Sequence, residues 1–248
     1  MKRSDSNKAR LFTRVLPELA ASTPYFSMET IVGRMAAANI VVTAASLQSY
    51  MSEAMKNGIV CDAGRGWYSC IVNPCTLNTK PIKWSITRIE KAFPLLEFSC
   101  WSTEQVNPYM HHLLAKFVTF VHADRDLMPA LFDAMQGWQG YRVYLDPKVA
   151  DAGKFRVEDK TIVIRPSTSE SPPPMVPHAA SVEQLLVDLA VEIETLPLMS
   201  RGEFQDMAWH VATTGRLMIP ALMRYARRNH RTLIDVFGKH WSTNGTNS

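Results

Sequence analysis

The sequence predicts an α+β protein in which an N-terminal winged helix-turn-helix domain precedes a mixed α/β domain with a helical C-terminus. Two observations favour this class. Residues 7–72 contain three helical patterns and then two strand-like runs around a glycine-containing loop, which is the element order of a winged helix. Residues 85–230 alternate strand and helix patterns before ending in helices. A polar, proline-containing stretch at 73–83 indicates a boundary, so we expect domains at residues 1–78 and 79–248.

The three N-terminal helices are predicted from apolar spacing and from capping residues. Apolar residues recur at helical spacing from 11 to 19, although Pro17 predicts a kink or an early end. Ser27 is a preferred N-cap for the second helix, and Thr43 is one for the third. Gly58 follows the third helix and can adopt the left-handed conformation that ends helices.

The winged helix is completed by a predicted β-hairpin. Its strands are residues 59–61 and 67–72, and the loop between them contains Asp62 and Gly64, which are typical turn residues. Many winged domains mediate only protein contacts, so this order of elements does not by itself establish DNA binding.

The second domain is predicted to be mixed. The expected strands are residues 95–101, 117–122, 141–145 and 161–165, and the expected helices are residues 85–92, 126–138, 181–196, 203–213 and 219–230. Residues 166–177 contain five prolines and several serines, which predicts an exposed loop.

Composition and charge narrow the classes of function. Hydrophobic residues make up 46% of the chain and charged residues 20%, which excludes a disordered protein. Residues 1–80 carry nine Lys/Arg and five Asp/Glu, so nine minus five gives the whole net charge of +4. A local positive charge favours phosphate binding, although a charge of this size also serves solubility.

No signal peptide or membrane span is expected. The uncharged stretch at 35–52 contains several polar residues that would be costly in lipid. The four cysteines, Cys61, Cys70, Cys75 and Cys100, are too few for a disulfide scaffold and lack the close pairing of a zinc site. We therefore expect a cytoplasmic protein with free thiols, no metal and no cofactor.

The third predicted helix is the candidate recognition helix. Its outward residues are expected to contact DNA: Ser46, Gln48, Ser49, Ser52 and Lys56. Glutamine can bridge two atoms of an adenine edge, and serine can donate or accept in the major groove. Arg65 at the hairpin tip is expected to reach the backbone or the minor groove, and Arg10 and Arg14 on the first helix are expected to contact phosphate. The alternative is an ordinary solvated surface.

A second basic cluster lies near the C-terminus. The cluster consists of Arg224, Arg227, Arg228 and Arg231. Their spacing of i, i+3, i+4 and i+7 predicts that all four lie on one side of a helix. Such like charges repel one another, so they require an acidic partner, a phosphate or carboxylates of the same chain. A contact with DNA or with a protein partner is one of these alternatives.

An enzymatic alternative depends on Asp124 and Asp126. Two carboxylates one residue apart are typical of the metal clamp of nucleotidyltransferases. Those enzymes also need a Gly-Ser turn, and the sequence has no Gly-Ser pair. The preferred interpretation is that the pair ends a strand and that one Asp caps the next helix. We therefore expect no catalytic residue.

The stretch Phe98–Met110 resembles a known family. Its residues FSCWST and NPYM are similar to a signature of AbiEi-like antitoxins of type IV toxin–antitoxin, or abortive-infection, systems. Further similar stretches follow in the same order at residues 117–121, 141–147, 162–172, 181–189 and 222–228. In place of the family's usual Ser-Glu-Ala-Pro, this chain has Ser169-Glu170-Ser171-Pro172 and two more prolines.

The resemblance implies a DNA-binding antitoxin that functions in phage defence. Its winged helix would bind double-stranded DNA at its own promoter as a transcriptional repressor. Its C-terminal domain would counter a toxin that resembles a nucleotidyltransferase. Two alternatives remain open: a regulator of a mobile element with no toxin partner, or a metal-dependent nucleotidyltransferase or nuclease.

Overall fold

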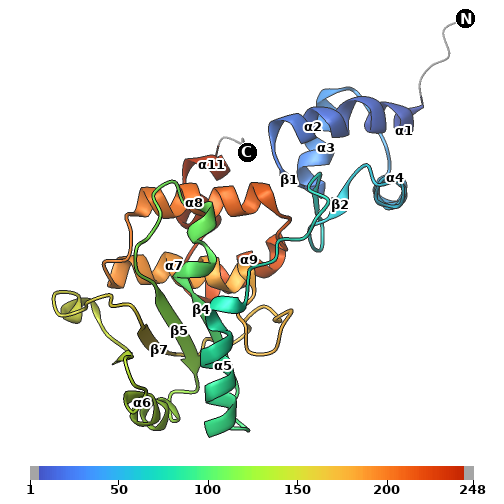
Figure 1. The fold of residues 1–248 in the computed structure, drawn as a ribbon. Coiled ribbons are helices and arrows are strands. Elements are labelled where there is room, and N and C mark those ends of the chain that lie inside the picture. Colours follow the sequence, from blue (N-terminus) through green and yellow to red (C-terminus); the bar gives the residue numbers. More distant parts are fainter. Residues whose placement is uncertain (1–5, 243–248) are drawn as a thin grey trace, which may run out of the picture. The chain divides into compact units, whose positions relative to one another are not determined.

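The computed structural model describes residues 6–242, and it shows a mixed α+β chain with a helical C-terminus (Figure 1). The described residues form two compact units. The first unit holds residues 6–75, 212–221 and 239–242, and the second holds residues 76–211 and 222–238. The boundary expected at residue 78 therefore lies close to residue 75, where the chain first passes from the first unit to the second. The two later segments of the first unit lie in the part of the chain that was assigned to the second domain.

The first unit contains short helices and a small antiparallel sheet. Its elements are α1 (Asn7–Arg10), the π-helical η1 (Leu11–Val15), α2 (Leu16–Ser22), β1 (Tyr25–Ser27), α3 (Met28–Ala37), α4 (Ala44–Lys56), β2 (Cys61–Asp62), β3 (Trp67–Ser69) and α11 (Lys239–Ser242). The strand order is β1-β3-β2. Strand β1 was not predicted, because three residues are too few to show an alternating pattern.

Helical structure continues through Pro17 instead of ending there. The wider π-helical turn η1 precedes the proline, and Pro17 occupies the first turn of α2, where its missing N–H costs no hydrogen bond. The capping predictions are confirmed. The Ser27 hydroxyl accepts a hydrogen bond from the Thr30 N–H at 3.1 Å, and Gly58 has a φ of +69°. The Thr43 hydroxyl caps α4 in the same way.

The core of the first unit is apolar and closed. Helices η1, α2, α3 and α4 and the loop after α4 supply fully or nearly fully buried side chains, among them Leu11, Leu19, Ile31, Met35, Leu47 and Met51. Burying such side chains contributes about 1.5–3 kcal/mol each before the entropic cost of folding. The polar residues between them at helical spacing are left at the surface of the unit.

Residues 212–221 belong to the first unit because they satisfy its buried polar groups. The Tyr25 hydroxyl donates to the carbonyl of Ala212 at 2.8 Å and accepts from the Leu217 N–H at 2.8 Å. The Arg216 N–H donates to the carbonyl of Asn73, and the Ile219 N–H donates to that of Ala63. These bonds join positions that are about 140 to 190 residues apart in sequence, so no local pattern indicates them.

The second unit contains a four-stranded sheet with helices. Its strands are β4 (Phe98–Ser102), β5 (Val118–Ala123), β6 (Arg142–Leu145) and β7 (Thr161–Pro166). The strand order is β4-β5-β7-β6, in which β5, β7 and β6 are parallel and β4 is antiparallel. The remaining elements are α5 (Lys80–Ala92), η2 (Thr103–Gln105), η3 (Asn107–Tyr109), α6 (Met128–Gln136), η4 (Val149–Asp151), α7 (Val182–Thr195) and α10 (Leu233–Phe237). Helices α8 (Arg201–Thr214) and α9 (Ile219–Arg228) belong in part to each unit.

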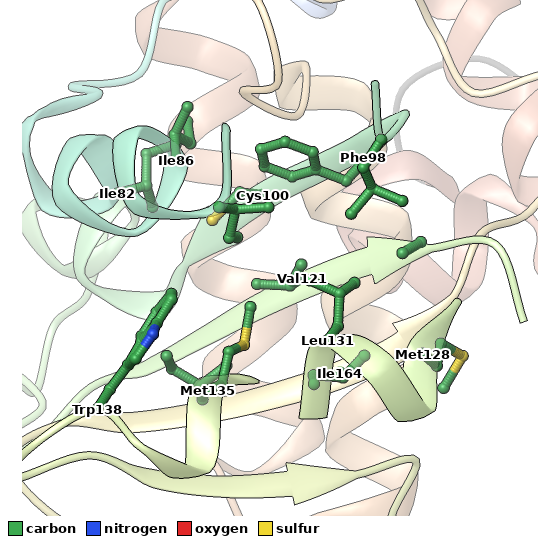
Figure 2. Packing of buried hydrophobic residues seen from close by; sticks show 14 of the residues in the cluster. Ile82, Ile86, Phe98, Cys100, Val121, Met128, Leu131, Met135, Trp138 and Ile164 are labelled. Carbon is green, nitrogen blue, oxygen red and sulfur yellow. The ribbon is translucent and has the colours of Figure 1, made fainter. Parts of the chain in front are cut away.

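Both faces of this sheet are covered. Phe98, Cys100, Val121 and Ile164 point from one face into a cluster with α5 and α6 (Figure 2). The alternate residues of the same strands point to the other face, where α7 packs; there the Gln184 side chain donates to the Ser99 hydroxyl. Sheets with parallel strands are usually covered on both faces, and this explains why β5 and β7 are almost wholly buried.

Helix α5 begins five residues earlier than predicted. Pro81 led us to place the start at residue 85, but Pro81 lies in the first turn of the helix, where proline is well tolerated. None of the helices in residues 6–242 is long and apolar enough to cross a membrane.

Candidate nucleic-acid interface

Helix α4 presents a row of short polar side chains at its surface. Leu47, Met51 and Ala54 are buried in the core of the first unit. Gln48, Ser49, Ser52 and Lys56 are therefore exposed on the opposite side of the helix. The amide of Gln48 and the hydroxyl of Ser49 make no hydrogen bond within residues 6–242, whereas the Ser52 hydroxyl donates to the Gln48 carbonyl at 2.9 Å.

Ser46 is placed differently from the other predicted residues of this helix. It is half-buried, its N–H donates to the Thr43 hydroxyl at 3.2 Å, and its own hydroxyl accepts from Thr43 at 2.9 Å. Ser46 is thus part of the N-cap of α4, and its hydroxyl has an acceptor role there.

The hairpin loop holds Arg65 at an exposed position. Gly64 and Gly66, on either side of it, have φ values of +103° and +76°, which side chains with a Cβ rarely adopt. The Asp62 carboxylate accepts from the Gly64 N–H at 3.0 Å and fixes the start of the turn. After the loop, the Trp67 ring lies 5.8 Å from the Trp241 ring of α11.

The two arginines of the first helix have partners within the unit. Arg10 Nη2 donates to the carbonyl of Ala38 at 2.6 Å, so this guanidinium caps the end of α3. Arg14 Nε lies 3.1 Å from the Glu18 carboxylate one turn later, and both side chains are exposed. Such a surface pair is worth less than about 1 kcal/mol, so Arg14 can exchange partners at little cost.

Two of the four arginines of the C-terminal cluster are paired with carboxylates of the same unit. Arg228 pairs with Glu170, and Arg231 pairs with Glu194. The prediction that all four arginines share one side of a helix is wrong for Arg231. Helix α9 ends at Arg228, and His230 has a φ of +55°, so the chain has already turned before Arg231. Arg224 and Arg227 are exposed on the helix itself.

The pair Asp124 and Asp126 lies in an exposed turn directly after β5. The Asp124 carboxylate accepts from the Asp126 N–H at 2.9 Å, which is a turn contact. The suggestion that one of them caps the next helix is wrong, since α6 has Leu127 at its N-cap position without a side-chain bond. Among the described residues, no group of three His, Cys, Asp or Glu is placed to hold a metal ion.

The two hairpin cysteines do not pair with each other across the strands. Cys61 pairs in register with Ser69, so it does not lie opposite Cys70, and Cys70 is exposed. All four cysteines are free thiols. Burial raises the pKa of the Cys100 thiol far above its usual range, which makes that thiol unreactive.

A buried polar network in the second unit was not predicted from the sequence. Arg165, near the end of β7, makes two parallel bonds of 2.7 and 2.6 Å to the Glu192 carboxylate on α7. The same guanidinium donates to Asp146 at 3.0 Å and to the carbonyl of Pro147. These contacts hold α7 against the ends of the parallel strands, and they neutralise the buried arginine.

A second part of this network involves His122 and Asp188. Trp101 Nε1 donates to His122 Nε2 at 3.1 Å, and Asp188 Oδ2 lies 3.5 Å from the same ring nitrogen. The Tyr225 hydroxyl donates to the other oxygen of Asp188 at 2.8 Å. Burial lowers the pKa of His122 to about 4 and raises that of Asp188 to about 7. The imidazole is therefore neutral, with Nε2 as an acceptor.

A signal for this network was present in the sequence. Asp188 and Glu192 lie one helical turn apart in the stretch 182–192, which is otherwise mostly apolar. Carboxylates on an apolar helix face indicate buried charge partners, but the partners themselves lie on strands and cannot be identified from spacing. A hollow of about 460 Å³ opens over these groups and is also lined by Lys148 and Asn229.

Taken together, these features define an α+β protein whose first unit exposes a polar helix and a loop with an exposed arginine, and whose second unit contains a buried charge network around Arg165. The chain belongs to a family of unknown function, DUF6577, whose model matches residues 46–242. The matched region begins inside α4 and includes the hairpin and the second unit. The search of curated proteins gave no match.

Proposed function

We propose that the first unit is a winged helix that binds duplex DNA, with α4 in the major groove and the Arg65 loop as the wing. The observation that carries the proposal is the exposed face of α4. The side chains of Gln48 and Ser49 make no hydrogen bond within residues 6–242, and Lys56 ends the same face. Short uncharged side chains allow a helix backbone to approach base edges closely.

The order of elements supports this proposal. In winged helices, a strand and two helices precede a hairpin, and the second of those helices reads the groove. Here β1, α3 and α4 precede the hairpin β2–β3, and β1 pairs with β3. Helix α3 is capped at its end by Arg10, which fixes the connection into α4.

Each residue of the proposed interface has a distinct task. Gln48 would read an adenine edge with its amide, which contributes to discrimination between sequences. Arg65 and Lys56 would contact phosphates, which contributes affinity without sequence preference. Ser49 and Ser52 lie between Gln48 and Lys56 in sequence, and their shorter side chains would contact the DNA there. Arg14 would add a phosphate contact after releasing Glu18, whereas Arg10 has a structural task.

The biological role that we propose is that of an antitoxin and autorepressor. The similarity of residues 98–110 to AbiEi-like antitoxins supports this role. In it, the first unit represses the protein's own operon and the second unit counters a nucleotidyltransferase-like toxin without catalysis. The exposed Arg224 and Arg227 on α9 are candidates for that protein contact.

A gel-shift titration against the DNA upstream of the gene, at two salt concentrations, tests DNA binding. Arg65→Ala should weaken binding to all duplexes and lower the salt slope by about 1. Gln48→Ala should cost about 1–3 kcal/mol on the operator and little on unrelated DNA. Lys154→Ala, at an exposed cation of the second unit, is the control and should bind as the wild type does.

The two parts of the proposal fail separately. If the wild type binds no duplex at low salt, then the first unit is not a DNA reader, and α4 is a protein-contact surface. If it binds DNA but the product of the neighbouring gene neither copurifies with it nor becomes less toxic, then the protein is a regulator without that partner.

A further inference from the structure

Helix α5 carries a row of cations and one tryptophan along its exposed face. Lys80, Trp84, Arg88 and Lys91 are spaced i, i+4, i+8 and i+11, so they lie in one line on the helix, and we call them the α5 stripe. All four are exposed, and the stripe is about 16 Å long at 1.5 Å per residue. The opposite face of α5 supplies Ile82, Ile86 and Ile89 to the core.

An aromatic cluster holds the middle of the stripe in place. The Trp84 ring stacks on the Tyr141 ring, with centroids 4.6 Å apart and planes 1° apart. The Arg88 guanidinium lies 4.9 Å from the Trp84 ring and 5.0 Å from the Trp138 ring. Trp138 is itself part of the core in Figure 2, so the cluster is anchored. Trp84 nevertheless remains 43% exposed.

The cations of the stripe differ from Arg228 and Arg231 of the C-terminal cluster in their partners. Within residues 6–242, Lys80, Arg88 and Lys91 form no ion pair, whereas Arg228 and Arg231 each have a carboxylate. The first turn of α5 contains no acidic residue, so Lys80 lies at the positive end of the helix dipole without compensation. This arrangement costs stability unless an anion from outside the chain offsets it.

We propose that the α5 stripe binds single-stranded nucleic acid. The three cations would follow the phosphate backbone, and a base would pack against the part of the Trp84 ring that Tyr141 and Arg88 leave exposed. A positively charged track with an exposed aromatic ring is the combination by which proteins hold single strands without strong sequence preference. The surface lies wholly in the second unit and does not depend on the winged helix proposed above.

The exposed ring favours a single strand over a duplex. Duplex backbone contacts need cations and hydrogen-bond donors, and they leave an exposed indole without a partner. In a single strand the bases are unpaired, and a base can cover the exposed part of the Trp84 ring beside Tyr141 and Arg88. Arg88 is well suited to such a partner, because its planar group can stay on the rings while its N–H groups reach a phosphate.

Fluorescence anisotropy of the full-length protein with labelled oligo(dT) and oligo(U) tests the proposal, with an unlabelled duplex as the competitor. Trp84→Ala should weaken binding about tenfold, and Trp84→Phe should restore most of it. The triple variant Lys80→Gln, Arg88→Gln and Lys91→Gln should lower the salt slope by about 2. If both strands bind equally well, the phosphates and bases suffice, and if only one binds, the 2′-hydroxyl or the thymine methyl group also contributes.

Two controls make the result decisive. Lys154→Gln removes an exposed cation elsewhere in the second unit and should leave strand binding unchanged. In the gel-shift assay, the triple variant should bind the duplex as the wild type does, so failure of the winged-helix proposal is distinguishable from failure of this one. Wild-type affinity in Trp84→Ala, an unchanged salt slope in the triple variant, or equal displacement by the duplex would overturn the proposal. If Trp84→Ala does not fold, the triple variant alone decides.

Discussion

Replacing Asp188 by Asn should make the stability of the protein depend on pH in a way that the wild type does not. In the folded chain, burial lowers the pKa of His122 to about 4 from 6.5 and raises that of Asp188 to about 7 from 3.8. Trp101 supports the neutral imidazole by donating to its Nε2, and Tyr225 donates to the Asp188 carboxylate. Glu192 and Arg165 are the nearby charges, and their effects on His122 oppose each other.

The two buried groups have opposite effects on stability. Between pH 4 and 6.5 the unfolded chain holds a proton on His122 that the folded chain lacks, so His122 costs stability as pH falls through this window. In nearly the same window the folded chain holds a proton on Asp188 that the unfolded chain lacks, so Asp188 costs stability as pH rises. One proton is gained and one is lost, and the pair therefore contributes almost no pH dependence.

Removing either partner exposes the effect of the other. In Asp188→Asn only the His122 effect remains. Relative to the wild type, the free energy of unfolding should therefore increase by about 1.4 kcal/mol for each unit that the pH rises from 4 to 6.5. In His122→Gln it should fall by about the same amount per unit as pH rises from 4 to 7. The two variants should thus differ from the wild type with opposite signs.

Urea unfolding followed by far-UV circular dichroism at several pH values measures these slopes. The control is Asp133→Asn, which removes an exposed carboxylate on α6 of the same unit. The reasoning would be refuted if both network variants kept the wild-type pH dependence, or if they changed it with the same sign.

Two further predictions concern packing. Gly64→Ala should destabilise the protein by several kcal/mol, because its Cβ would lie 2.5 Å from Pro220 and its φ of +103° is strained for alanine. Gly66→Ala has open space around it and should cost only about 1 kcal/mol. Glu192→Gln should cost about 3 kcal/mol, because it leaves the buried Arg165 with only one carboxylate partner. Urea midpoints of the three variants test both predictions.

The control for Glu192→Gln is a matched substitution in an exposed ion pair. Glu170→Gln breaks the exposed pair with Arg228 and should change stability by less than about 1 kcal/mol. If Glu170→Gln and Glu192→Gln were equally destabilising, burial would not be the reason for the larger cost. If Gly64→Ala and Gly66→Ala were equally destabilising, the contact with Pro220 would not be the cause.

Local patterns determined most of the secondary structure. Apolar residues every three to four positions marked the helices, and Ser27 and Thr43 marked two helix starts, because caps satisfy backbone groups close by in sequence. The strands near residues 98, 118, 142 and 161 were identified within a few residues of their observed ends. Pro81 was misinterpreted as linker, and this concealed the α5 stripe.

Tertiary structure decided what depends on residues far apart in the chain. The sequence by itself determined an α+β chain, an exposed polar face on α4 and a basic hairpin tip, because these follow from local spacing. Only the fold brought Arg165 to Glu192 and Tyr25 to residues 212–217, because such pairs are selected by strand order and helix packing. The sheet order β4-β5-β7-β6 likewise has no local signal, since each strand's partner is set by the burial of both faces.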